Sequence, residues 1–244
     1  MKNELIYQVE EYVQDTFAKG ERNNNLLIGH DYKHVSRVRN WALQIAHGEG
    51  YTDILSVELA ALLHDIALPY FQKQKKRSEH GGIGAEIAIK YLREKSNLSE
   101  KQINSITTAI KYHGASPSTV RAVLENDDNG GMLLKIVRDA DMIDAVGAIG
   151  LMRAFTSKAS LPEYDPLNIK GETWGLSSKQ FDERFAKKLG IGNYLLDQIN
   201  FQISYYDNLH TKTARNLATP LVDFMKLFVF QLEHEIVFQD TNNT

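Results

Sequence analysis

The amino-acid sequence predicts an all-α fold. Apolar residues recur at spacings of three and four along most of the 244-residue chain, and the strict alternation that is typical of β-strands is hard to find. Asp31, Asp53 and Ser99 each precede such a stretch, and their side chains can accept hydrogen bonds from the free amides of a first helical turn. These observations together predict a mainly helical protein.

The apolar periodicity places the helices in order along the chain, with ends defined to about two to four residues. They are expected at about 3–18, 31–47, 53–68, 82–95, 99–113, 133–157, 179–208 and 213–238. Large aromatic side chains on these apolar stripes are expected in the core, namely Trp41, Phe155, Phe224, Phe228 and Phe230. We therefore expect a helical bundle with additional C-terminal helices.

Two segments interrupt the helical pattern. Residues 71–82 contain a run of basic side chains followed by Gly81 and Gly82, which predicts a loop that is either a solvated turn or a phosphate-attracting rim. Residues 157–178 contain two prolines and two glycines with few periodic apolar residues. This is the longest expected loop, and a loop of that length is often a lid, a binding segment or a mobile connection.

Composition limits the classes of function. Hydrophobic residues make up 43% and charged residues 24% of the chain, which is typical of a globular protein and not of a disordered or membrane protein. The net charge of −3 disfavours duplex DNA as a partner. The chain has no cysteine, so His, Asp and Glu are the available metal ligands. No segment is apolar for long enough to span a membrane, and no secretory signal is evident, so we expect a cytoplasmic protein.

The residues with the most informative chemistry are histidines and aspartates on otherwise apolar helices. His34 lies near the start of one expected helix, and His64 and Asp65 end a buried stripe of leucines. A buried ionised carboxylate is costly without a partner, and a divalent cation would compensate Asp65. Asp141 lies in a similarly apolar helix.

Helical geometry separates the three aspartates near residue 140. A helix turns by about 100° per residue, so Asp141 and Asp144 can face one region while Asp139 points elsewhere. We therefore expect Asp141 as a metal ligand and Asp144 as a residue that orients a ligand. Taken singly, each of these residues could be an ordinary buried polar group with a protein partner. The whole set, however, has the ligand types that suit a divalent metal.

The motif order His34, then His64-Asp65, then Asp141 resembles the HD-domain metal-dependent phosphohydrolases. Within that superfamily the segments 60–66 and 139–150 look most similar to small bacterial nucleoside triphosphate pyrophosphohydrolase-like proteins, and the resemblance covers roughly residues 25–238. It implies a single HD-type helical domain, with a metal-binding core at about 25–157, the loop 157–178 and C-terminal helices at about 179–238. It also implies that His34, His64, Asp65 and Asp141 bind the metal.

Two further histidines resemble the second metal site of binuclear HD phosphodiesterases. His80 and His113 occupy comparable places in the motif order, although Leu68 stands where the HD-GYP enzymes usually carry lysine and no Gly-Tyr-Pro follows. If His80 and His113 converge on Asp65, that carboxylate can bridge two cations. The four-ligand motif of the most similar hydrolases instead favours one tightly bound metal, with His113 left near the pocket to contact phosphate.

Two arginines are candidates to meet phosphate oxygens. Arg37 lies one turn after His34, and Arg138 lies beside the last motif, but each could equally be an ordinary arginine on a helix surface.

These residues predict a metal-dependent hydrolase of phosphate esters or anhydrides whose substrate is a small phosphorylated molecule, a nucleotide above all. The cation would lower the pKa of a water molecule and neutralise phosphoryl charge, and Asp65 would help to deprotonate that water. The ligand types suit manganese, iron, cobalt, nickel, zinc and sometimes magnesium.

Two alternatives stay open. One is a binuclear cyclic-nucleotide-type phosphodiesterase, and the other is a non-catalytic, metal-stabilised regulatory protein that binds a ligand. The sequence does not set the oligomeric state, and a homodimer is among the options.

Overall fold

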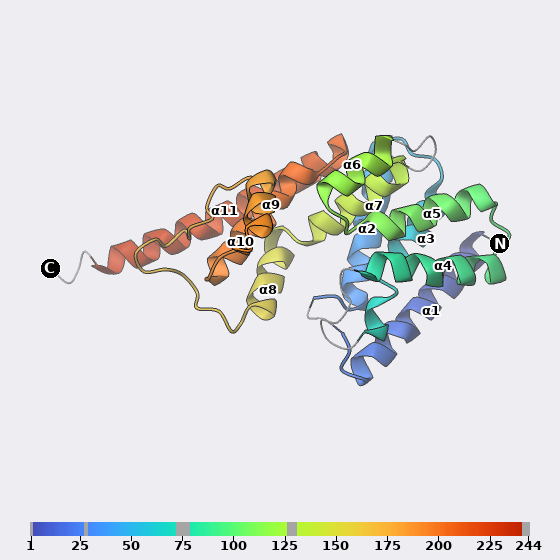
Figure 1. The fold of residues 1–244 in the computed structure, drawn as a ribbon, viewed down its shortest axis with the longest axis horizontal. Helices are drawn as coiled ribbons and strands as arrows, with labels where there is room; N and C mark the ends of the chain where they lie inside the picture. Colours follow the sequence, from blue (N-terminus) through green and yellow to red (C-terminus); the bar gives the residue numbers. More distant parts are fainter. Residues whose placement is uncertain (1, 27–28, 72–78, 126–130, 241–244) are drawn as a thin grey trace. The chain divides into compact units, whose positions relative to one another are not determined.

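The computed structural model describes residues 2–26, 29–71, 79–125 and 131–240. Within these ranges the regular structure is helical and no β-strand occurs, which confirms the all-α prediction (Figure 1). The chain divides into two compact units. Unit 1 comprises Met1–Asp141 with His210–Ala214, and unit 2 comprises Met142–Leu209 with Arg215–Thr244. The single-domain organisation stays a prediction.

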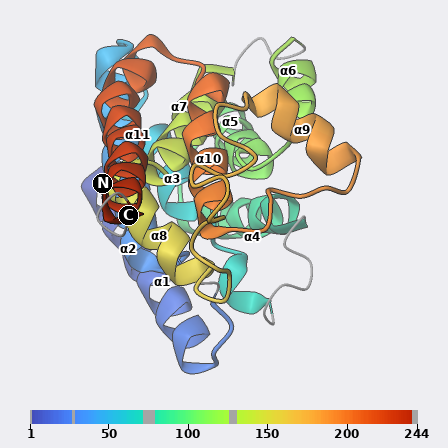
Figure 2. The same ribbon diagram turned by 90° about the vertical axis from the view of Figure 1, so that its left-hand side faces the viewer.

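Unit 1 is built around a short, mostly buried helix. Its described elements are α1 (Lys2–Arg22), α2 (Tyr32–Gly48), α3 (Ile54–Leu63), η1 (Leu68–Tyr70), α4 (His80–Lys95), α5 (Glu100–Tyr112), α6 (Pro117–Glu125) and most of α7 (Gly131–Asp144). The helix α3 contacts α1, α2 and α5, and these helices can be followed in Figure 2. Every residue from Leu59 to Leu63 is fully buried. The core of unit 1 therefore lies directly before the His64-Asp65 pair.

The expected N-terminal caps are present on α2, α3 and α5. The side chains of Asp31, Asp53 and Ser99 accept hydrogen bonds from the backbone N–H groups of His34, Ser56 and Gln102, respectively. Caps of this kind contribute roughly 1 kcal/mol each to helix stability. The cap at Asp31 also fixes the first turn of α2, which carries His34.

The start of α4 agrees with the expectation within its margin. This helix begins at His80, two residues before the expected start at about residue 82, so Gly81 and Gly82 lie in its first turn and not in the expected loop. A Cβ atom at Gly81 would lie 2.4 Å from the backbone oxygen of Lys111, so only glycine allows the first turn of α4 to approach the last turn of α5 this closely. Gly81 therefore brings His80 next to His113 instead of providing loop freedom. The basic residues Lys73 to Arg77 lie outside the described residues.

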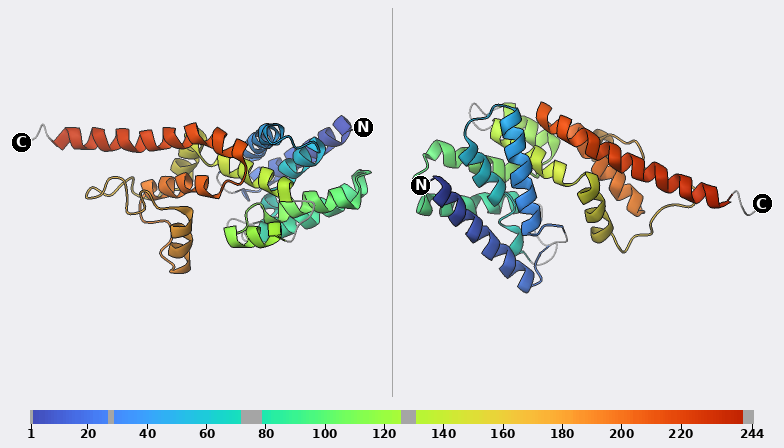
Figure 3. Two further views of the ribbon diagram at one scale, coloured as in Figure 1. Left: turned by 90° about the horizontal axis from the view of Figure 1, so that it is seen from above. Right: turned by 180° about the vertical axis from the view of Figure 1, so that it is seen from behind.

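Two expected helices that reach into unit 2 are each divided into shorter ones. Its described elements are the end of α7, α8 (Gly147–Ser157), α9 (Ser178–Ala186), α10 (Leu195–Ser204), η3 (Tyr205–Asn208) and most of α11 (Lys212–Asp240). The expected helix 133–157 is broken because Gly147 has a φ of +72° and begins a new helix after extended Val146. The expected helix 179–208 is interrupted by residues 187–194. By contrast, α11 runs as one helix although it contains Pro220 (Figure 3).

The long loop before α9 is held to α10 by buried polar side chains. The carboxylate of Asp197 accepts hydrogen bonds from the backbone N–H and the hydroxyl of Thr173, and the Asn200 amide donates to the backbone oxygen of Lys170. Both Asp197 and Asn200 are buried. These contacts anchor the middle of the loop 157–178. Its role as a lid over a substrate stays a prediction.

Three aromatic residues that were expected in the core are partly exposed. Phe155, Phe224 and Phe230 have relative exposures of 39%, 47% and 48%. On α11, the side chains that pack into the core are Val222, Met225 and Val229. The apolar stripe of this helix is wider than that packed face. No described helix combines the length and the apolar character that crossing a membrane would need.

Candidate metal centre

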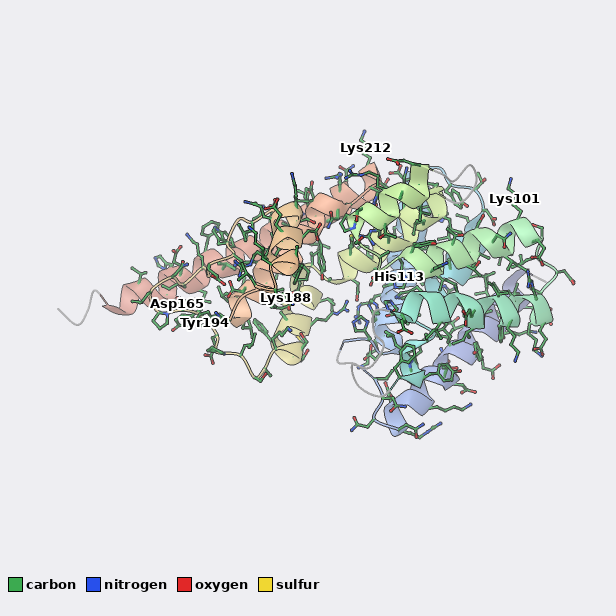
Figure 4. The ribbon with its side chains drawn as sticks, in the orientation of Figure 1. Lys101, His113, Asp165, Lys188, Tyr194 and Lys212 are labelled. Atoms are coloured by element: carbon green, nitrogen blue, oxygen red, sulfur yellow. The ribbon has the colours of Figure 1, made fainter. Side chains whose placement is uncertain are left out.

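Five elements of unit 1 bring histidine and aspartate side chains together. His34 comes from the first turn of α2, His64 and Asp65 follow α3, His80 begins α4, His113 follows α5, and Asp141 lies in the last turn of α7. His113 is labelled in Figure 4, at the C-terminal end of α5. The structure thus gathers the four predicted ligands and both additional histidines.

The first group of donor atoms surrounds one oxygen of Asp65. The Nε2 atoms of His34 and His64 lie 3.3 Å apart, and each lies 3.5 Å from Asp65 Oδ2. Asp141 Oδ1 lies 3.3 Å from the same Nε2 atom of His34. The predicted ligands His34, His64, Asp65 and Asp141 therefore converge on one point.

The second group surrounds the other oxygen of the same carboxylate. The Nε2 atoms of His80 and His113 lie 3.2 Å apart, and they lie 3.6 Å and 3.5 Å from Asp65 Oδ1, respectively. Asp65 therefore stands between two pairs of histidines, with one carboxylate oxygen toward each pair.

Two of these histidines have their tautomer set by the same local contact. The Nδ1 atoms of His64 and His113 each lie 2.7 Å from the backbone oxygen three residues earlier, Ala61 and Ile110, respectively. A carbonyl accepts a hydrogen bond, so each Nδ1 must carry the proton. In the neutral imidazole, Nε2 then presents its lone pair to the site, as a metal-binding histidine requires.

The spacing of the donor atoms fits bound cations. Ligands held at roughly 2.0–2.2 Å from one metal ion lie roughly 3–3.5 Å from each other. Two imidazole lone pairs that face each other at 3.2–3.3 Å repel unless a proton or a cation lies between them. His34, His64 and Asp141 would hold one cation, His80 and His113 the other, and Asp65 both.

The electrostatic environment keeps the two carboxylates ionised. Burial alone would raise the pKa of Asp65, but the charge of His64 and interactions with the other surrounding histidines lower this pKa well below its ordinary value. Burial also opposes ionisation of Asp141, yet His34 and the other histidines lower the pKa of Asp141. The pKa of His113 is raised because hydrogen bonding and charge from Asp65 outweigh burial.

His30 also lies at the site, although no role for it was predicted from the sequence. Its Nδ1 atom lies 3.0 Å from Asp65 Oδ2. The available signal was its position in the run His30-Asp31-Tyr32-Lys33-His34, directly before the helix cap. A residue outside the helix carries no periodicity, so the direction of its side chain could not be predicted.

The other residues predicted to act at the site are Arg37, Arg138 and Asp144, and their surroundings differ. Arg37 is half-buried on α2. Arg138 is 3% exposed, and its guanidinium donates to the backbone oxygens of His113 and Ala115, so it is not the ordinary surface arginine considered above. Asp144, in unit 2, accepts a hydrogen bond from Arg153. Roles for Arg37 and Arg138 toward phosphate, and for Asp144 toward a ligand, stay predictions.

Asp139 points away from the predicted metal ligands, as helical geometry indicated. Its buried carboxylate accepts hydrogen bonds from the backbone N–H groups of His210 and Thr211 and from the Thr211 hydroxyl. These contacts tie α7 to the segment that leads into α11. Asp139 therefore has a structural role within unit 1.

Comparison with known proteins agrees with this geometry. Residues 31–146 match the HD domain family, which covers the predicted ligands His34, His64, Asp65 and Asp141. This match identifies residues 31–146 as similar to the HD domain, in agreement with the resemblance that the motif order indicated.

Similar proteins extend beyond the matched segment. The Bacillus subtilis protein YpgQ is 28% identical over 217 residues, which is 85% of each chain. A solved HD-superfamily hydrolase from Bacillus thuringiensis gives a TM-score of 0.62 at 22% identity, over 96% of this chain and 98% of the other. The structure of YpgQ in complex with ADP gives a TM-score of 0.57 at 23% identity, over 95% and 97%. These structural likenesses extend the shared fold to nearly the whole chain.

Proposed function

We propose that this protein is a metal-dependent hydrolase of phosphate esters or anhydrides that uses two divalent cations bridged by Asp65. The observation that carries the proposal is the division of the Asp65 carboxylate, whose Oδ2 faces His34 and His64 while Oδ1 faces His80 and His113. The four-ligand motif favoured one cation. We expected two cations only if His80 and His113 converge on Asp65, and both histidines do lie beside this carboxylate.

The exposure of the side chains indicates where a substrate would enter. His34, His64 and His113 are nearly fully buried, whereas the side chains of His80 and Asp141 are 18% and 27% exposed. The phosphoryl group would therefore approach on the side of His80 and Asp141. Bound cations there would polarise the phosphoryl oxygens and lower the pKa of the attacking water.

A nucleotide is the proposed substrate class. The resemblance to pyrophosphohydrolase-like proteins and the complex of YpgQ with ADP support it. For a nucleoside triphosphate, the water oxygen would bond to the α-phosphorus while the bond from this phosphorus to the α–β bridging oxygen breaks. The products would be the nucleoside monophosphate and pyrophosphate. Asp65 as the base for the water proton stays a prediction, and the contacts at both of its oxygens favour a bridging ligand instead.

A cyclic-nucleotide-type phosphodiesterase is the second candidate, because the His80 and His113 pair provides the additional donors that such binuclear enzymes use. It would break one ester bond of the substrate and release no pyrophosphate. The non-catalytic alternative predicts metal binding without turnover. The same measurements distinguish all three.

The test combines metal counting with product analysis. The purified protein is reconstituted with Mn²⁺, and bound metal is measured in the parent, in the His80→Ala plus His113→Ala double variant and in the control His47→Ala, an exposed histidine of α2. We expect about two cations per chain in the parent and the control, and about one in the double variant, by the ligand sets above. A value near one in all three would refute the second cation.

Substrate class is tested with nucleoside mono- and triphosphates and with cyclic nucleotides. Pyrophosphate released from triphosphates would support the α–β cleavage. Orthophosphate released from monophosphates alone would make the protein a nucleotidase, and opening of cyclic nucleotides alone would favour the second candidate. Metal binding with no turnover of any substrate would contradict an enzymatic role.

A further inference from the structure

The contact between His30 and Asp65 differs in kind from the other contacts of this carboxylate. His30 Nδ1 lies 3.0 Å from Asp65 Oδ2, whereas His34, His64, His80 and His113 place their Nε2 atoms 3.5–3.6 Å from the nearer Asp65 oxygen. The shorter distance is that of an N–H···O hydrogen bond. The longer distances exceed those of good hydrogen bonds and lie at the upper end of the spacing of donors around a shared cation.

The local structure holds the His30 side chain in this place. Asp31 is the N-cap of α2 and accepts a hydrogen bond from the His34 backbone N–H at 3.0 Å, which fixes the chain beside His30. The His30 ring packs edge-on against the His34 ring, with centroids 5.2 Å apart and an interplanar angle of 76°. Its side chain is 17% exposed. His30 is therefore a well-placed neighbour of the first donor group, although it lies outside the motif ligands.

An aspartate carboxylate can rotate about its Cβ–Cγ bond, and here rotation would change which oxygen meets which pair of histidines. We infer that His30 is a positioning residue, whose Nδ1–H donates to Asp65 Oδ2 and holds the carboxylate in the orientation that serves both cations. This inference rests on the proposed two-cation function. Hydrogen bonds from outside the ligand set commonly orient metal-binding side chains in this way.

The choice of substitutions separates a hydrogen-bond donor from a metal ligand. In asparagine the side-chain N–H group is as many bonds from the backbone as His30 Nδ1, so His30→Asn can keep the donor. In glutamine the amide nitrogen lies one bond farther out and corresponds to Nε2. His30→Ala removes the donor altogether. The inference therefore ranks the variants, with His30→Asn close to the parent and His30→Gln close to His30→Ala.

A matched control is available in unit 1. His210 Nδ1 lies 3.1 Å from Asp139 Oδ1, and its side chain is 24% exposed, so this pair repeats the His-Asp contact away from the metal ligands. His210→Ala removes a comparable side-chain contact and leaves the backbone N–H of residue 210 in place. It should change metal affinity by less than about twofold, because it alters no group that holds a ligand.

The experiment measures Co²⁺ binding to the full-length chain by its visible absorption spectrum, which reports coordination independently of activity. We expect His30→Ala and His30→Gln to weaken Co²⁺ binding by about 10- to 100-fold and to alter the spectrum, with His30→Asn within about threefold of the parent. With Mn²⁺ and a hydrolysed substrate, kcat should fall more than KM rises. Far-UV circular dichroism verifies that each variant is folded.

Each outcome bears on a different proposal. If the parent binds no Co²⁺, the proposed metal-dependent function fails, and this inference fails with it. If the parent binds Co²⁺ and His30→Ala binds it equally with an unchanged spectrum, only the positioning role is refuted. Equal impairment of His30→Asn and His30→Ala would also refute that role, because the imidazole itself would then be needed as a ligand.

Discussion

Asp65 and Asp197 are both buried aspartates, one in each unit, and their partners differ completely. The carboxylate of Asp197 accepts hydrogen bonds from the Thr173 hydroxyl and from the backbone N–H groups of Asn193 and Tyr194. Asp65 is instead surrounded by histidine nitrogens. Backbone N–H groups always carry their proton, whereas an imidazole nitrogen can present a lone pair to a cation. Burial of a carboxylate therefore does not indicate a metal site by itself, and the type of partner decides it.

Asp139 extends the comparison within unit 1. It lies two residues before Asp141 on the same helix, but backbone N–H groups of residues 210 and 211 satisfy it. Asp141 lies beside His34 and is partly exposed. Neighbouring aspartates on one helix can thus have a structural and a metal-binding role, and the predictions below test that division.

The largest effect is expected at the His64-Asp65 pair. His64→Ala or Asp65→Ala should remove bound metal and lower hydrolysis by at least about a thousandfold, because the cations activate water and stabilise phosphoryl charge. The helical fold should be retained, since the site is formed at the ends of packed helices. Elemental analysis and activity of both variants test this. Full metal occupancy with unchanged turnover would show that the assignment is wrong.

Asp197→Ala should act on stability instead of chemistry. It leaves the backbone N–H groups of residues 193 and 194 and the Thr173 hydroxyl without their acceptor, and we expect the free energy of unfolding to fall by about 3 kcal/mol. Denaturant titration measures the loss. Metal content per folded chain should equal that of the parent, and a loss of metal would contradict the division between the two aspartates.

Substitution of Arg138 should have a smaller effect, on both stability and metal affinity. Its guanidinium donates to the backbone oxygens of His113 and Ala115, so it holds the end of α5 that carries His113. Arg138→Met should lower the free energy of unfolding by about 1–3 kcal/mol and weaken the second cation more than the first. Sequential metal titration distinguishes the two cations. Equal weakening of both would indicate a general loss of structure.

The smallest effect is a pH dependence at Glu49. Hydrogen bonds from the Thr213 side chain and backbone lower the pKa of Glu49 below its ordinary value of 4.5. Because the pKa of Glu49 is lower in the folded state than in the unfolded state, its ionised side chain stabilises the fold fully at a pH above the unfolded-state pKa. This stabilisation is lost as the pH falls through the folded-state pKa. Glu49→Gln should therefore be less stable than the parent at neutral pH, with a difference that shrinks below pH 4.5. A difference that is constant with pH would refute this role.

Helical periodicity correctly predicted the helices that pack against the core along the whole length of one face. The caps at Asp31, Asp53 and Ser99 and the buried stripe of α3 follow from local chemistry, and the structure has them. The breaks near residues 145 and 190 were missed, because the apolar pattern continues through them while the backbone turns. Partly exposed Phe224 and Phe230 show the same limit, since an apolar residue on a helical stripe need not be buried.

The sequence alone determined the fold class, the types of the candidate metal ligands and their order His34, His64-Asp65, Asp141, because these depend on residue chemistry and helical spacing. It also indicated that Asp139 points away from Asp141, since both lie on one helix. Only the tertiary structure decided that His80 and His113 meet the second oxygen of Asp65, and that His30 reaches the first. Those contacts join residues about 15 to 50 positions apart, and no local periodicity encodes such distances. The close approach of α4 and α5 at Gly81 brings His80 beside His113.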